Sequence, residues 1–322
     1  MATMAPMAII KESPVKRPGR KAIIAKAYDY PLQVLANRKT GVFAVLGAAL
    51  CFGTTGTTQQ LGAPHVAPVS VGAARLICGS IFLFLFAFFQ RKDRGHQRLP
   101  FKDLLVCGAG IGIYQLTFFS AVHLTGIAVA TVTALGSVPT FTAMVAFVLL
   151  GEKPARSWYL GTAGTLVGIF LLGTSHGISG FNPVGFMLAA VAGFGFAVFS
   201  VVSRRSLAIG VQPIWLTATS FGVASLITLP FLFAENPSWI ATTKGGLTVL
   251  WLGLVPTAIG YFLFTYGLRR VESSLAATVV LAEPATATIL AAVVIGEHLV
   301  LQSYFGILTV ALGILYISRS RS

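Results

Sequence analysis

The chain contains Val148-Leu149-Leu150-Gly151-Glu152 and repeats it, nearly unchanged, as Val293-Val294-Ile295-Gly296-Glu297, 145 residues later. A proline precedes each glutamate by 13 residues, and glycines follow it at 9 and 16 residues. These matched positions are Pro139 and Pro284, Gly161 and Gly306, and Gly168 and Gly313. Such agreement at one shift indicates a tandem duplication, in which each copy holds the same set of structural elements.

The duplication continues towards the amino terminus with slightly different offsets. Tyr114 and Thr131 match Tyr261 and Thr278, and Phe52-Gly53 matches Phe194-Gly195. The repeated unit is therefore roughly 140 residues long, and two copies account for most of the chain.

Composition predicts that the repeated elements are membrane-spanning helices. Of the 322 residues, 55% are apolar and only 10% are charged, whereas soluble domains carry about 25% charged residues. Ten apolar runs are long enough to cross a hydrocarbon core of about 30 Å as helices. The expected spans are residues 41–61, 68–89, 103–122, 127–150, 158–174, 183–202, 212–233, 247–268, 274–295 and 302–318.

The positive charges predict the orientation of these spans. If the amino terminus is cytoplasmic, 21 of the 23 Lys and Arg residues lie in tails and loops on the cytoplasmic side. Lys244 then lies outside, and Arg75 lies within a span. This asymmetry is typical of multi-pass membrane proteins and predicts a plasma (inner) membrane protein with both termini cytoplasmic.

Five spans per repeat place the second repeat upside down relative to the first. Inverted repeats are the usual architecture of secondary transporters, because one unit in two orientations can give outward-open and inward-open states of similar energy. We expect a basic, largely disordered cytoplasmic tail over residues 1–40, a first repeat over 41–178, a second over 179–318 and a short cytoplasmic tail over 319–322.

Other classes of function have little support in the sequence. The net charge of +14 comes from the expected cytoplasmic loops and tail, which favours contact with anionic membrane lipids over nucleic acid. The chain lacks zinc-protease and Walker motifs, and it has no clustered acids to hold a metal. We therefore expect no enzyme activity, no cofactor and no metal site.

Each repeat has a mid-helix proline followed by an apolar run that ends in Gly-Glu. The stretches Gly151-Glu152-Lys153-Pro154, Glu283-Pro284 and Gly296-Glu297 carry a resemblance to the EamA-like family of the drug/metabolite transporter superfamily, over residues 41–318. The first repeat departs from the family pattern, with Ser137-Val138-Pro139 in place of Glu-Pro. The resemblance implies a secondary carrier that exports or imports small metabolites, commonly amino acids or related compounds, and we expect an exporter.

Two charged side chains lie well inside the expected spans, several residues from either end. A charge at the bilayer centre costs at least about 2.5–3.5 kcal/mol on insertion scales, so each one needs an explanation. Glu283 is a candidate for proton coupling or for binding a substrate amine, and the alternative is a structural acid bonded to a neighbouring helix. Arg75 is a candidate clamp for a substrate carboxylate or a counter-ion to Glu283, and the alternative is an arginine that snorkels to the outer surface.

Polar and aromatic residues at a similar depth complete the candidate substrate site. Tyr114, Gln115 and Phe118 lie in the third span, and Tyr261 takes the matching place in the eighth. With Arg75 and Glu283 they would line a cavity suited to an amphipathic small molecule. The alternative is that the aromatic residues only pack or face lipid.

Two prolines and two glutamates are candidates for helix breaks and gates. Pro139 and Pro284 each free a main-chain carbonyl in mid-membrane, where protein or a watery cavity must satisfy it. Glu152 and Glu297 end helices at opposite membrane surfaces, where each can be hydrated or meet the amino terminus of the following helix.

The main alternative to a carrier is a channel, or a lipid- or drug-translocating protein without ion coupling. An inverted repeat alone does not establish alternating access, and flux that does not saturate would favour the alternative. The sequence leaves open the substrate, the direction of transport and the coupling ion, with proton coupling as one option. It also leaves open the oligomeric state, monomer or homodimer, and the role of the basic amino-terminal tail.

Overall fold

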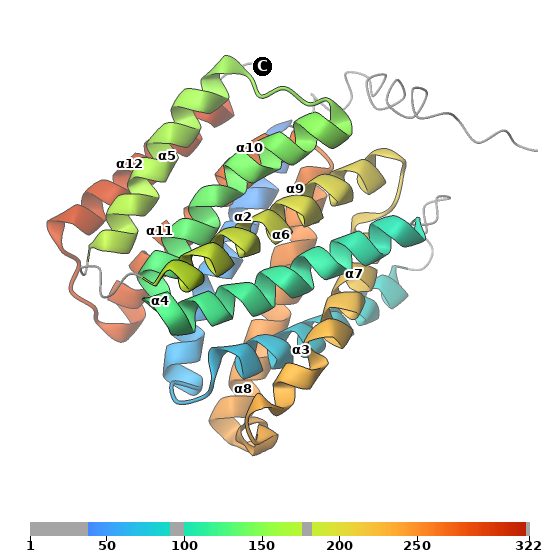
Figure 1. The fold of residues 1–322 in the computed structure, drawn as a ribbon, viewed down its shortest axis with the longest axis vertical. Coiled ribbons are helices and arrows are strands. Elements are labelled where there is room, and N and C mark those ends of the chain that lie inside the picture. The colour runs from blue at the N-terminus through green and yellow to red at the C-terminus, as the bar shows by residue number, and fades with distance from the viewer. Residues whose placement is uncertain (1–37, 91–99, 176–181, 320–322) are drawn as a thin grey trace, which may run out of the picture.

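The computed structural model describes residues 38–90, 100–175 and 182–319, and the regular structure in these ranges is helical throughout. The disordered tail expected over residues 1–40 falls almost entirely outside the described residues, as does most of the expected carboxyl-terminal tail. The helices form one bundle, with α5 and α12 at one end and α3, α7 and α8 at the other (Figure 1).

Within the described ranges, nine segments are helical, long and apolar enough to cross a membrane. They are α2 (Arg38–Gly62), α3 (Pro68–Phe89), α4 (Phe101–Leu150), α5 (Arg156–Thr174), α6 (Pro183–Ala208), α7 with η3 (Pro213–Thr228, Leu229–Ala234), α8 with η5 and α9 (Thr243–Leu252, Gly253–Ile259, Gly260–Leu268), α10 with α11 and η6 (Ser273–Val279, Ala282–Leu290, Ala291–Ile295) and α12 (Leu301–Arg319). A short 3-10 helix, η4 (Pro237–Ala241), precedes α8. The chain is therefore a multi-pass membrane protein.

The helix α4 joins the expected third and fourth spans into one element of 50 residues. A straight helix of that length would measure about 75 Å, more than twice the thickness of a hydrocarbon core. The backbone leaves the helical conformation at Gly126, with φ 80° and ψ 159°, angles that are open essentially to glycine alone. Figure 1 shows α4 doubling back along its course.

The repeated Gly-Glu motif stops a helix by the same main-chain geometry in both halves. Gly151 and Gly296 have φ angles of 71° and 81°, the left-handed conformation favoured just after a helix. The main-chain N–H of the next residue, Glu152 or Glu297, donates to the carbonyl six residues earlier at 3.3 Å. The motif therefore fixes where each helix ends and leaves the glutamate side chain free to make other contacts.

The two matched prolines have different effects on the backbone. Before Pro284 the helix is interrupted between α10 and α11, and the main-chain N–H of Glu283 donates to the carbonyl of Val280 at 3.0 Å. Pro139 instead stays inside α4, where Gly126 alone has non-helical angles. The structure thus differs from the expectation of a helix break at Pro139, because membrane helices tolerate an interior proline when surrounding protein satisfies the backbone.

A third proline shows how a freed carbonyl is satisfied. Pro256 lies in the π-helical segment η5 and cannot donate to the carbonyl of Leu252, four residues earlier. The hydroxyl of Thr257 donates to this carbonyl at 2.7 Å. The hydroxyl of the next residue therefore replaces the main-chain donor that the proline lacks.

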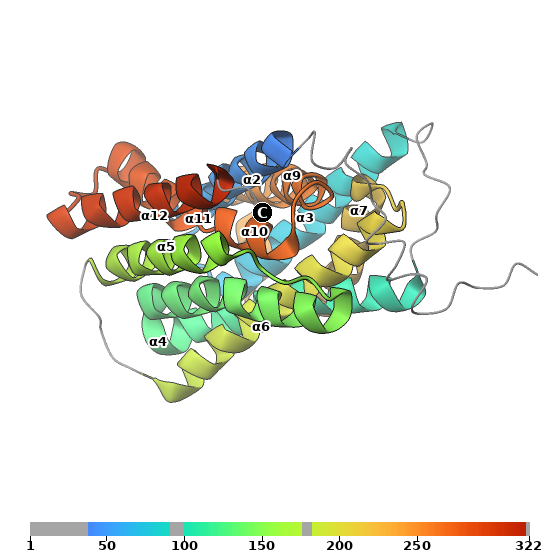
Figure 2. The same cartoon turned by 90° about the horizontal axis from the view of Figure 1, so that it is seen from above.

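The helices α5 and α12 lie side by side, and they meet through the matched glycines (Figure 2). A Cβ atom at Gly168 would lie 2.8 Å from the carbonyl oxygen of Gly306, and one at Gly313 would lie 2.8 Å from that of Gly161. The contact between Gly168 and Gly306 is thus mirrored by the contact between their repeat counterparts, Gly313 and Gly161. A two-fold axis that relates two antiparallel helices produces this pattern.

Candidate functional site

Arg75 of α3 lies at the centre of the candidate site. Its guanidinium donates from Nη2 to Oε1 of Gln115 in α4 at 3.2 Å and from Nη1 to Oγ1 of Thr55 in α2 at 3.5 Å. The side chain is 8% exposed, so Arg75 does not snorkel to the membrane surface. Three helices therefore hold this cation inside the protein.

The Arg75–Gln115 pair keeps two buried donors unused. Within the described part of the chain, neither Nε of Arg75 nor Nε2 of Gln115 has a hydrogen-bond partner. An unpaired buried donor costs about 1–3 kcal/mol. Both nitrogens therefore gain from any acceptor that enters the site.

Glu283, in the first turn of α11, lies near this pair and is half-buried. It interacts electrostatically with Arg75, Tyr114 and Tyr261. Among the described residues its carboxylate forms neither a hydrogen bond nor an ion pair within 4.0 Å. The acid and the arginine thus face the same region without being direct partners.

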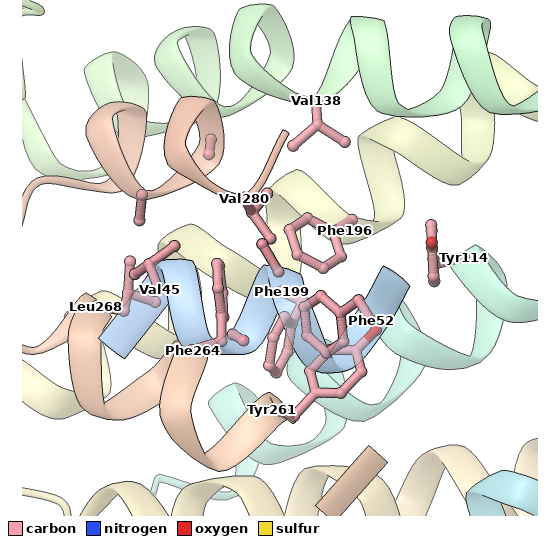
Figure 3. Packing of buried hydrophobic residues seen from close by; sticks show 14 of the residues in the cluster. Val45, Phe52, Tyr114, Val138, Phe196, Phe199, Tyr261, Phe264, Leu268 and Val280 are labelled. Carbon is pink, nitrogen blue, oxygen red and sulfur yellow. The ribbon is translucent and has the colours of Figure 1, made fainter. Parts of the chain in front are cut away.

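The two tyrosines of the candidate site belong to a cluster of buried aromatic rings, which Figure 3 shows. Tyr114 stacks on half-buried Phe118 with ring centroids 5.8 Å apart, and it contacts Phe196 of α6 at 5.6 Å. Tyr261 of α9 contacts Phe52 of α2 at 4.7 Å. The two repeat-matched tyrosines are therefore buried and joined to one aromatic cluster through rings from both halves of the chain.

The structure brings together the six residues that the sequence suggested for a substrate site. The family model of the EamA-like transporter family matches the chain twice, over residues 39–174 and 183–319. This chain belongs to the EamA-like transporter family.

Relatives and a solved structure agree with the EamA-like assignment. The "Uncharacterized transporter YwfM" of Bacillus subtilis (strain 168) is 36% identical over 275 residues, covering 85% of this chain and 92% of YwfM. The "Uncharacterized inner membrane transporter YedA" of Escherichia coli (strain K12) is 26% identical over 265 residues, covering 80% of this chain and 83% of YedA. One crystal structure shares the fold with a TM-score of 0.76 and 22% identity, covering 87% of this chain and 98% of its own.

Sequence reasoning missed several residues that surround the candidate site. They are Thr55 and the aromatic residues Phe52, Phe196, Phe199, Phe221 and Phe264. The chain has 24 phenylalanines, so residue type alone does not single out any of them. A useful signal existed only for Phe52, which lies in a matched pair of the duplication.

A central cavity in the EamA-like chain stays a prediction. Grooves of about 340 Å³ and 550 Å³ lie elsewhere, between α5 and α12 and beside Lys153 where α4 ends and α5 begins. Neither groove is lined by Arg75, Gln115 or Glu283. Both grooves are lined largely by apolar side chains, so lipid tails suit them better than a polar metabolite.

The two glutamates of the Gly-Glu motifs have unequal surroundings. Oε1 of Glu152 accepts from Nε of Arg204 at 3.2 Å, and Oε2 accepts from the main-chain N–H of Ser273 at 3.2 Å. Glu152 therefore meets the start of α10 in the other half of the chain, and not the amino terminus of the following helix α5. Glu297 is exposed, and its side chain makes no hydrogen bond or ion pair within the described ranges.

Proposed function

We propose that the chain is a secondary active transporter that exports amino acids or related small zwitterions by alternating access. The buried Arg75–Gln115 pair with Glu283 nearby is the observation that carries the proposal. The proposed location is the plasma (inner) membrane, with both termini cytoplasmic. The EamA-like family supplies the class, a transporter, and the site residues supply the substrate class.

The carboxylate of the substrate would bind at Arg75 and Gln115. The two unpaired nitrogens, Nε and Nε2, are donors, and a carboxylate offers two acceptor oxygens with about four lone pairs. A charge-assisted hydrogen bond contributes about 1.5–3 kcal/mol. An anionic group at these two donors is therefore bound more favourably than a neutral carbonyl would be.

The ammonium of the substrate would bind at Glu283. This carboxylate is half-buried and has unused acceptor oxygens within the described part of the chain. The neighbouring Tyr114, Phe118 and Tyr261 offer ring surfaces for the substrate side chain. Since an acid at membrane depth can be charged or neutral, Glu283 is also the residue that we propose for proton coupling.

For alternating access we propose ten crossings arranged as two inverted repeats of five. The reversal at Gly126 supports a division of α4 into two crossings. The crossed contacts Gly161–Gly313 and Gly168–Gly306 support a two-fold relation between the halves. The chain has no nucleotide-binding motif, so we propose that an ion or substrate gradient drives transport.

Counterflow tests this function directly. Purified protein is reconstituted into liposomes loaded with unlabelled amino acids, and uptake of single labelled amino acids is followed with and without a proton gradient. We expect saturable exchange that Glu283→Gln abolishes. The control is Glu235→Gln, which removes a carboxylate that lies after η3 and away from the site, and it should leave exchange intact. Non-saturating flux without counterflow would indicate a channel. Absence of exchange for every amino acid, with folded protein in the liposomes, would overturn the substrate class.

A further inference from the structure

One end of the bundle is closed by a network that joins both halves of the chain. Glu152, after α4, accepts from Arg204 of α6 and from the main-chain N–H of Ser273 at the start of α10. Arg204 also donates from Nη1 to the carbonyl of Leu268, where α9 ends, at 2.7 Å. We call Glu152, Arg204 and the main-chain groups of Leu268 and Ser273 the inner latch, since the proposed orientation places them on the cytoplasmic side.

The stretch of helix beside the inner latch is buried, whereas the matching stretch in the other half of the chain is largely not buried. All nine residues from Ser273 to Leu281 are buried. In the matching stretch, residues 126–134, only Ala130 and Ala134 are buried. Since a perfect two-fold axis would give matched residues equal burial, the two ends differ in packing: the stretch at the latch is buried, and the matching stretch at the opposite end is more exposed.

The opposite end contains the matching acid without the matching cation. Glu297 is exposed, and a Cβ atom at Gly296 would meet nothing within 4 Å. At the offsets of the duplication, 142 and 147 residues, Arg204 corresponds to Gly62 and Ser273 corresponds to Gly126. The main-chain partner of the latch therefore has an equivalent at this end, but the guanidinium does not.

We infer that Glu152 and Glu297 alternate as gate residues: Glu152 closes the cytoplasmic side by binding Arg204 and Ser273, and Glu297 closes the outer side by binding main-chain N–H groups near Gly126. The inference rests on the alternating access of the proposed function. The outer closure lacks a cation, so the resting transporter populates the state with the cytoplasmic side closed more than the opposite state.

Thiol labelling tests the inference without any substrate. Cys51, Cys78 and Cys107 are replaced by alanine in a background that keeps the melting temperature of the unmodified protein, and Ser274→Cys then serves as a reporter one residue into α10. Its side chain replaces a small hydroxyl that is 2% exposed. A membrane-impermeant maleimide is applied from the cytoplasmic side in inside-out vesicles, and the labelling rate is measured.

We expect Arg204→Ala to raise the labelling rate about tenfold or more by shifting the population away from the closed state. Arg204→Lys should give an intermediate labelling rate, because lysine keeps the positive charge but lacks the planar guanidinium that donates to both Glu152 and Leu268. Glu297→Gln should lower the rate or leave it unchanged, because it weakens only the competing state. The matched control is Arg205→Ala: this neighbouring arginine pairs with Asp103 of α4 and makes no latch contact.

Two results would overturn the inference. One is a labelling rate that Arg204→Ala and Arg204→Lys both leave unchanged in folded protein, as judged by size-exclusion chromatography and thermal unfolding. The other is acceleration by Glu297→Gln or by Arg205→Ala equal to that by Arg204→Ala, which would show general loosening. Failure of amino-acid counterflow with the expected labelling pattern would overturn the substrate class alone, so the two proposals fail separately.

Discussion

Gly168 of α5 lies directly against the main chain of Gly306 in α12, with 2.8 Å between a Cβ built on Gly168 and the carbonyl oxygen of Gly306. Gly306 is the repeat counterpart of Gly161, and Gly161 in turn contacts Gly313, the counterpart of Gly168. This crossed contact joins the last helices of the two halves. Small residues at such positions let membrane helices approach closely, where lipid offers no hydrophobic driving force between them.

Replacing Gly168 by alanine should destabilise the protein. The added methyl would overlap Val310 and Gly306, at distances of 2.7 and 2.8 Å, so the helices would have to separate. Overpacking of this kind costs about 1–3 kcal/mol. Thermal unfolding in detergent measures the effect. Gly164→Ala is the matched control on the same helix, because its Cβ would meet its nearest atom at 3.9 Å; equal melting temperatures for both variants would contradict the contact.

Gly126→Ala should disturb the reversal inside α4. The backbone angles at Gly126, φ 80° and ψ 159°, strain any residue with a side chain by about 1–3 kcal/mol. We expect a lower melting temperature and weaker expression in the membrane. Gly136→Ala, in the same helix with its nearest atom at 3.9 Å, should be tolerated. Normal stability of Gly126→Ala would mean that the chain reverses without left-handed backbone.

Arg75→Lys should impair transport although it keeps the positive charge. A lysine cannot bond Gln115 and Thr55 simultaneously and still present a donor to the substrate, because it lacks the planar fork of a guanidinium. Losing one charge-assisted hydrogen bond of about 1.5–3 kcal/mol lowers the exchange rate at low substrate by about 10- to 100-fold. Arg156→Lys, at the exposed start of α5, should leave exchange unchanged, and equal losses in both variants would contradict a role for the fork.

Glu272 should make stability depend on pH. Burial raises the pKa of this carboxyl group above its ordinary value of 4.5, and the nearby Glu152 raises it further, whereas Arg204 and Arg38 lower it. A raised pKa in the folded state means that the folded protein binds the proton more tightly than the unfolded chain. The resulting stabilisation is complete below the ordinary pKa and is lost as pH rises through the raised value.

Glu272→Gln removes this titration. Relative to the unmodified protein, the variant should gain stability as the pH is raised from 4.5 to 7, since the glutamine stays neutral while the half-buried glutamate becomes charged. Melting temperatures of both proteins across this range measure the difference. The control is Glu235→Gln, at a residue that lies after η3 and outside this cluster. A difference in melting temperature between the Glu272 variant and the unmodified protein that stays constant with pH would refute the effect.

Much of the candidate site could be inferred from single residues, but their pairings could not. Arg75 and Glu283 stand out because charges in apolar spans are costly, and Tyr114 and Tyr261 stand out because the duplication matches them. The bond from Arg75 to Gln115 and the absence of a direct Arg75–Glu283 ion pair depend on which helix faces meet. Hydropathy and spacing describe each helix alone and carry no information on that choice.

The amino-acid sequence by itself determined the class of the protein. Apolar runs long enough to cross a membrane, a duplication of roughly 140 residues and Gly-Glu helix stops follow from local composition and backbone geometry, which do not depend on distant contacts. The duplication also identifies four matched glycines, Gly161, Gly168, Gly306 and Gly313, and in the structure these four make the contacts between α5 and α12 described above.

The tertiary structure alone decided which matched residues have different surroundings. Glu152 and Glu297 are equivalent in sequence, yet one is bound by Arg204 and Ser273 and the other is exposed. Pro139 and Pro284 are equivalent too, yet only the second follows an interrupted helix. The physical reason is twofold: the halves differ in sequence, with Gly62 at the place that matches Arg204, and matched residues pack against different neighbours in one conformation.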